Sequence, residues 1–141
     1  MEFYQGNINS FDSFSSDNHI FKQMKDNKKI RVGITHGDIN GIGYEVILKA
    51  LEDSRMLELC TPIIYGSAKI ANYYRKQLEL PQFAINQVAK ASEARDGACS
   101  IINVVGEDTL IEPGKATGTA GKAAFIALEQ AVADLRNGYI D

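Results

Sequence analysis

Three glycines and an aspartate stand close together in residues 35–43, THGDINGIG, in a pattern that could bind an anionic ligand. Glycine allows positive φ in a turn, and it lets backbone N–H groups approach a ligand with no Cβ in the way. The spacing GxxxGxG is neither the dinucleotide fingerprint GxGxxG nor the P-loop GxxxxGK[ST]. Glycine turns are also common as plain strand-to-helix connections, so a purely structural role is an equal alternative.

The loop supplies the cofactor-binding residues that we predict from the sequence. They are Thr35, Gly37, Asp38, Asn40, Gly41 and Gly43. Asp38 could accept a hydrogen bond from a hydroxyl group of a ribose or a substrate, or it could cap the following turn through its own backbone. Asn40 could be the N-cap of the next helix. Glu45 is a weaker candidate, because the dipole of a helix N-terminus is enough to explain a carboxylate there.

A second segment, residues 114–122, reads GKATGTAGK and opens a later helix. Gly, Thr and Lys there are typical of a helix N-terminus that faces a phosphate, although threonine capping and glycine packing explain them equally well. His36 lies beside the predicted site and could act as an acid or a base, but only Asp38 is placed to orient it. We therefore predict no catalytic residue, and we find no His/Asp/Glu cluster that would hold a metal ion.

Apolar periodicity predicts the elements that position these loops. Strands are predicted at 30–35, 61–65, 83–88 and 100–105, and helices at 43–52, 68–78 and 118–136, with a short apolar turn at 56–59. Ser67 is the expected N-cap of the second helix, and Thr117 or Thr119 that of the last. The last helix is expected to bury a face with Ala120, Ala124, Leu128, Ala131 and Leu135. A bulky residue at 124 would then cost about 1–3 kcal/mol.

Composition limits the classes of function. The 141 residues carry a net charge of −3 with no dense basic face, which argues against nucleic-acid binding. No apolar segment approaches the ~20 residues that span a membrane. The two cysteines are far apart and lack a CxxC partner, as expected of reduced thiols in a cytoplasmic protein. Residues 1–28, rich in Ser, Asn and Asp, are predicted to be a flexible leader to an α/β domain at 29–141.

Strands and helices alternate along the domain, which indicates an α/β fold. A further strand would be due at residues 139–141, after the last helix. We therefore expect the chain to be a truncated part of a longer protein.

Three segments in order resemble the 4-hydroxythreonine-4-phosphate dehydrogenase family of pyridoxal phosphate biosynthesis. They are THGDINGIGYE followed by VILKAL, then LCTPIIYGSAKI, and finally GKATGTAGKAAFIALEQAVADLRNGYID. Ile39 and Tyr44 stand where the family usually has prolines. The resemblance covers residues 29–141 and implies an isocitrate/isopropylmalate dehydrogenase-like fold, a three-layer αβα arrangement that is incomplete in this chain.

The same resemblance implies a function for the whole protein. A member would be a cytoplasmic homodimer that oxidises and then decarboxylates the phosphorylated small molecule 4-phosphooxy-L-threonine, using NAD and a divalent metal. The family's metal ligands lie beyond the matched segments, so none is assigned here. The alternative is a non-catalytic α/β module that binds phosphate or a nucleotide weakly at most. No nucleic-acid or membrane partner is expected.

Overall fold

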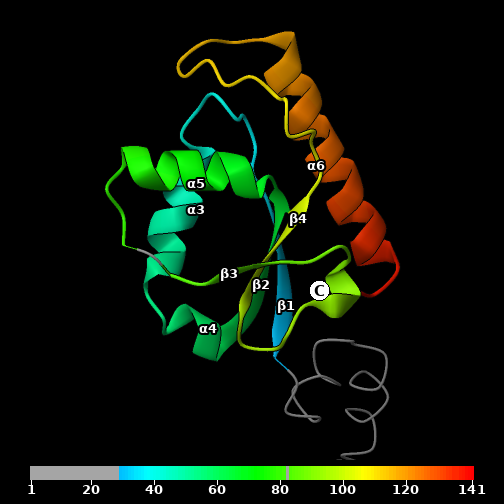
Figure 1. The fold of residues 1–141 in the computed structure, drawn as a ribbon. Helices are drawn as coiled ribbons and strands as arrows, with labels where there is room; N and C mark the ends of the chain where they lie inside the picture. The colour runs from blue at the N-terminus through cyan, green and yellow to red at the C-terminus, as the bar shows by residue number, and fades with distance from the viewer. Residues whose placement is uncertain (1–28, 82) are drawn as a thin grey trace, which may run out of the picture.

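A four-stranded parallel sheet forms the centre of the structure, a computed structural model that describes residues 29–81 and 83–141 (Figure 1). Its strands are β1 (Ile30–Thr35), β2 (Cys60–Gly66), β3 (Ile85–Gln87) and β4 (Cys99–Asn103), in the spatial order β1-β2-β4-β3. The register places Ile34 beside Ile64 and Ile64 beside Ile101. Every strand pair is parallel, which agrees with the predicted α/β fold class.

Helices cover both faces of this sheet and make three layers. One face carries α3 (Gly43–Glu52), α4 (Met56–Leu59) and α5 (Ala68–Gln77), and the other carries α6 (Gly118–Arg136), with the 3-10 turn η2 (Ala91–Glu93) beside it (Figure 1). The bounds of β1, α3 and α6 are those predicted. Ser67 accepts a hydrogen bond from the Ile70 amide at 3.3 Å and caps α5, which confirms the predicted cap.

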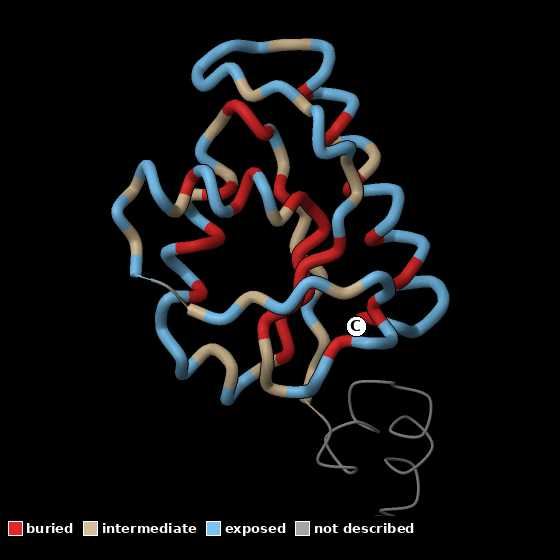
Figure 2. Tube along the Cα trace, viewed as in Figure 1, coloured by how far each residue is buried: buried red, intermediate tan, exposed pale blue. Residues whose placement is uncertain are grey.

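Two apolar clusters fill the spaces between the layers, and Figure 2 shows that burial follows the central strands. Ile64 and Ile101 pack towards α3 and α5. Ile63 and Tyr65, on the opposite face of the same strand, pack towards Ala127 of α6. The strands β2 and β4 are therefore covered on both faces, which explains the consecutive apolar residues Ile63–Tyr65 and Ile101–Ile102 at their centres.

The buried face of α6 differs from the prediction. Alanines at 120, 123, 127 and 131 and Asp134 face the sheet, whereas Ala124 is only half-buried. Leu128 and Leu135 are 51% and 49% exposed, so their predicted burial is wrong. Small residues let the helix approach the sheet closely, and the larger apolar residues consequently lie on the adjacent face, beside β1.

The edges of two strands also differ from the prediction. The strand predicted at 83–88 is reduced to β3, three residues long, and β4 ends at Asn103 rather than at 105. The predicted apolar turn at 56–59 is the short helix α4. No helix in the described ranges is long and apolar enough to cross a membrane. The predicted leader, residues 1–28, lies outside the described residues.

Candidate functional site

The connection from β1 to α3 is a tight turn that depends on two of its glycines. Gly37 has φ of +66°, in the left-handed region that favours glycine. A Cβ on Gly43 would lie 2.2 Å from the carbonyl oxygen of His36, so no larger residue fits there without a backbone shift. Asp38 closes the turn between them, since its Oδ1 accepts the Asn40 amide at 2.9 Å and its carbonyl accepts the Gly41 amide at 3.1 Å.

Asn40 clamps this turn to the segment that leads into α6. Its Nδ2 donates to the carbonyl of Lys115 at 2.9 Å and to Oγ1 of Thr117 at 3.2 Å. Its Oδ1 accepts the Glu112 amide at 2.8 Å. The side chain is buried and fully engaged. Asn40 therefore positions the loop, and the N-cap of α3 is Ile42, with no side-chain cap, instead of the predicted Asn40.

Ile39 anchors the turn to the core, and the sequence analysis did not predict this role. Its side chain is fully buried, and its carbonyl accepts a hydrogen bond from the Tyr74 hydroxyl at 2.6 Å. An isoleucine between a glycine turn and an asparagine could have signalled burial, but its partner on α5 is 35 residues away and carries no sequence signal.

Asp38 and the first turns of α6 line one hollow of about 380 Å³ at the carboxyl end of the sheet. The other lining residues are Ala116, Thr117, Ala120, Gly121 and Ala124. Asp38 is exposed, so its carboxylate is accessible to a ligand. The two segments that the sequence singled out thus meet, although about 80 residues separate them, and they meet where open α/β sheets bind ligands.

The N-terminus of α6 gives this hollow a positive end. Thr117 is the N-cap, and its Oγ1 accepts the Ala120 amide at 3.2 Å, which decides between the two predicted caps. The first amides of a helix have no partner within it, and the helix dipole adds a partial positive charge there. With the Asp38 carboxylate opposite, the hollow suits a ligand that carries both a phosphate and a hydroxyl group.

The remaining candidates lie around this hollow rather than in it. Thr35 is half-buried and lines a different hollow, with Val32 and Leu128. The glycines shape the turn. Lys115 is paired with Glu112 at 2.9 Å, and Glu45 with Lys49 at 2.5 Å, on exposed surface.

His36 is fully buried just after β1, and neither ring nitrogen has a hydrogen-bond partner among the described residues. Its ring lies 5.5 Å from that of Tyr44. Burial lowers the pKa of His36 below its ordinary value of 6.5, and the nearby backbone of Ala123 and then the charge of Asp38 oppose this only in part. A neutral imidazole sealed from solvent cannot exchange protons with a ligand in the hollow, so we assign His36 to the core.

The polar groups of the hollow fit part of a nucleotide or of a phosphorylated substrate. The amides at the start of α6 fit one phosphate, and the Asp38 carboxylate fits one hydroxyl group. They do not fit a metal ion, because no group of three His, Cys, Asp or Glu side chains within residues 29–81 and 83–141 could hold one. We therefore derive no chemistry through a metal from this chain.

A family model agrees with this architecture. Residues 58–141 match the model described as pyridoxal phosphate biosynthetic protein PdxA. The chain belongs to the PdxA family. The matched residues include β2, β4 and the whole of α6, and so one of the two walls of the Asp38 hollow.

Named relatives extend the similarity to the glycine loop. A 4-hydroxythreonine-4-phosphate dehydrogenase of Bacteroides thetaiotaomicron is 52% identical over 118 residues, 84% of this chain and 32% of the relative. A Clostridium botulinum protein whose name proposes D-threonate 4-phosphate dehydrogenase activity is 33% identical over 121 residues, 84% of this chain and 36% of its own length. The chain thus spans about a third of the length of these curated relatives.

The fold agrees as well. The crystal structure of a 4-hydroxythreonine-4-phosphate dehydrogenase from Burkholderia phymatum superimposes with a TM-score of 0.69 at 30% identity, covering 81% of this chain and 34% of that one. The predicted family and α/β fold class are therefore confirmed.

Proposed function

We propose that this chain supplies the glycine-loop wall of the ligand site in an NAD-dependent 4-hydroxythreonine-4-phosphate dehydrogenase. One observation carries the proposal: Asp38 and the N-terminus of α6 line the same hollow, at the carboxyl end of a parallel sheet, in a member of the PdxA family. The whole enzyme would oxidise and decarboxylate 4-phosphooxy-L-threonine in the cytoplasm, as a homodimer with a divalent metal held elsewhere.

The residues of this chain have a binding and orienting role in that enzyme. The free amides at the start of α6 would donate hydrogen bonds to a phosphate oxygen. The Asp38 carboxylate would accept a hydroxyl of the same ligand, either from a ribose or from the substrate. Bound NAD would supply the hydride acceptor. Asn40 and Gly43 would hold the loop at the distance from α6 that lets both groups act together.

The two relatives differ in the substrates that their names give, 4-hydroxythreonine 4-phosphate and D-threonate 4-phosphate. Both carry a phosphate and hydroxyl groups, and the Asp38 hollow has one group for each. The proposal for this chain is the first substrate, on the basis of the higher identity of the Bacteroides relative.

Calorimetric titration with NAD and, separately, with inorganic phosphate tests the proposal. Asp38→Asn should weaken NAD binding, because the hydroxyl loses a charged acceptor, and should leave phosphate binding equal or stronger, because a negative charge is removed. Asp53→Asn is the matched control, since Asp53 is exposed at the far end of α3 and pairs with Arg55. If the two substitutions had equal effects on NAD binding, Asp38 would not be a residue that binds NAD.

If neither probe binds at millimolar concentration, the chain is better described by the second candidate, an α/β module without a ligand site of its own. That candidate is consistent with a chain that spans about a third of its relatives.

A further inference from the structure

We propose that the cavity between η2, β4 and α6 is a second binding site, which takes a small organic ammonium ion with an apolar body and binds its nitrogen at Asp134. The cavity has a volume of about 500 Å³ and lies on the α6 side of the sheet. It shares no lining residue with the Asp38 hollow. The proposal therefore does not depend on the ligand that the Asp38 hollow binds.

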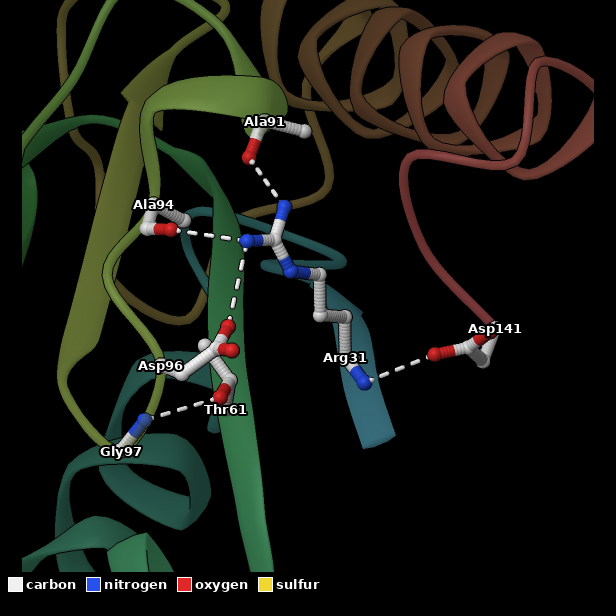
Figure 3. Close-up of polar contacts among 7 residues, drawn as sticks. All are labelled: Arg31, Thr61, Ala91, Ala94, Asp96, Gly97 and Asp141. Carbon is white, nitrogen blue, oxygen red and sulfur yellow. Dashed lines mark hydrogen bonds and ion pairs between the residues drawn. The ribbon is translucent and has the colours of Figure 1, made fainter. Parts of the chain in front are cut away.

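The protein itself fixes the wall of the cavity that η2 forms (Figure 3). The Arg31 guanidinium donates to the carbonyls of Ala91 and Ala94 at 3.2 and 3.0 Å. The same group donates to Oδ1 of Asp96 at 3.1 Å. Ala91 is buried, and residues 89–92 line the cavity. Because hydrogen bonds from the sheet already hold this wall, a ligand would not have to order it, which favours binding.

Asp134 is the buried charged group of this cavity, with 7% of its surface exposed. Its Oδ2 accepts a hydrogen bond from the Tyr65 hydroxyl at 2.8 Å. Burial, and then this hydrogen bond, raises the pKa of Tyr65, so the hydroxyl remains a donor. The other oxygen, Oδ1, has one partner among the described residues, Nε2 of Gln130 at a long 3.4 Å. A carboxylate offers about four acceptor sites, so Asp134 has room for further donors.

The position of this carboxylate is unfavourable for the folded chain alone. Asp134 lies in the last turn of α6, where the helix dipole places a partial negative charge. None of the ion pairs within residues 29–81 and 83–141 includes Asp134, although Lys90 lines the same cavity. A buried charge without an opposite charge costs free energy. A cation in the cavity would offset both effects, and residues that break a local rule in this way often mark functional sites.

The other lining residues indicate the class of cation. Ile102, Val104 and Ile126 line the same cavity with apolar side chains, and its volume is in the range of small-molecule sites. A metal ion does not suit it, because no group of three His, Cys, Asp or Glu side chains in the described part of the chain could hold one. An ammonium group brings three N–H donors to Asp134, and its hydrocarbon part would pack on the apolar side chains.

Titration of the ¹⁵N-labelled chain with benzylamine, an ammonium ion at neutral pH, tests the proposal. The amides of Ser92 and Gln130 should shift and saturate at millimolar concentration, and added salt should weaken binding. Benzyl alcohol has nearly the same shape without the charge, and it should bind at least about tenfold more weakly. Asp134→Asn should reduce the affinity for benzylamine to that for the alcohol. Glu129→Gln, at an exposed position of the same helix, is the matched control and should change it little.

A variant outside the buried pair keeps the test decisive if Asp134→Asn does not fold. Lys90 is exposed on the wall of the cavity, so Lys90→Glu should leave the fold intact. Because it replaces a positive charge by a negative one, it should tighten benzylamine binding about threefold at low salt. Lys76→Glu, exposed on α5 across the sheet, is the matched control and should have little effect.

Three results would each overturn the proposal. They are the absence of benzylamine shifts at millimolar concentration, equal binding of benzylamine and benzyl alcohol, and equal benzylamine affinities in the Lys90→Glu and Lys76→Glu variants. None of them bears on NAD or phosphate binding at Asp38, which the calorimetric experiment measures separately.

Discussion

Replacing Asn40 by alanine should release the glycine loop from the segment before α6. The substitution removes three side-chain hydrogen bonds, to Glu112, Lys115 and Thr117. A typical bond contributes about 0.5–1.5 kcal/mol net, and a buried group left unpaired costs more. The expected loss in the free energy of unfolding is therefore about 2–4 kcal/mol, a large share of the stability of an ordinary domain.

Urea denaturation followed by circular dichroism measures this loss. With a slope of about 2 kcal/mol/M, the midpoint should fall by roughly 1–2 M. The Glu112 amide, which loses its acceptor, should also exchange faster with solvent. Asn72→Ala is the matched control, because Asn72 is exposed on α5 and, within residues 29–81 and 83–141, its side chain accepts a hydrogen bond only from Arg75, at 2.7 Å. If the two variants have equal midpoints, Asn40 does not hold the two walls of the hollow together.

Three further substitutions test the positions of the loop, the buried histidine and α6. Gly43→Ala should lower the Tm by several degrees, since its Cβ would meet the His36 carbonyl, whereas Gly41→Ala, with its nearest neighbour at an ordinary 3.5 Å, should change it little. Burial keeps His36 neutral in the folded state, whereas the unfolded chain protonates it below about pH 6.5. The free energy of unfolding should therefore be highest above that pH and should fall as the pH drops below it. The difference between the urea midpoints at pH 7.5 and 5.5 should be smaller in His36→Gln than in the original chain. Ala127→Leu should lower the free energy of unfolding by about 1–3 kcal/mol, because the larger side chain would meet the sheet. Ala133→Leu, on the exposed face of α6, should leave it almost unchanged in the same assay.

Local sequence patterns were sufficient to predict most of the fold. The apolar run at β1, the serine before α5 and the proline–glycine turn before α6 each act over a few residues, and the elements they predict are present. Part of the buried face of α6 was predicted wrongly, because a local pattern does not contain the distance between the helix and the sheet. Periodicity favours the large residues Leu128 and Leu135, whereas the close approach of the helix to the sheet selects alanines, and that approach is a tertiary property.

The candidate site could be predicted only in part. Gly37 and Asp38 stand out in the sequence, because positive φ and an accessible carboxylate are local requirements. The role of Asn40 depends on Glu112 and Thr117, more than 70 residues away, and the burial of His36 depends on the layers above and below it. Sequence reasoning identified the two segments but not the hydrogen bonds that join them.

Amide chemical shifts recorded while the ¹⁵N-labelled chain is titrated with NAD test the central claim most directly. The account predicts that the amides of Gly37, Asp38, Gly118 and Thr119 shift together with a single dissociation constant, because one ligand contacts both walls of the hollow. Shifts confined to one segment, or gathered at residues far from Asp38, would contradict it.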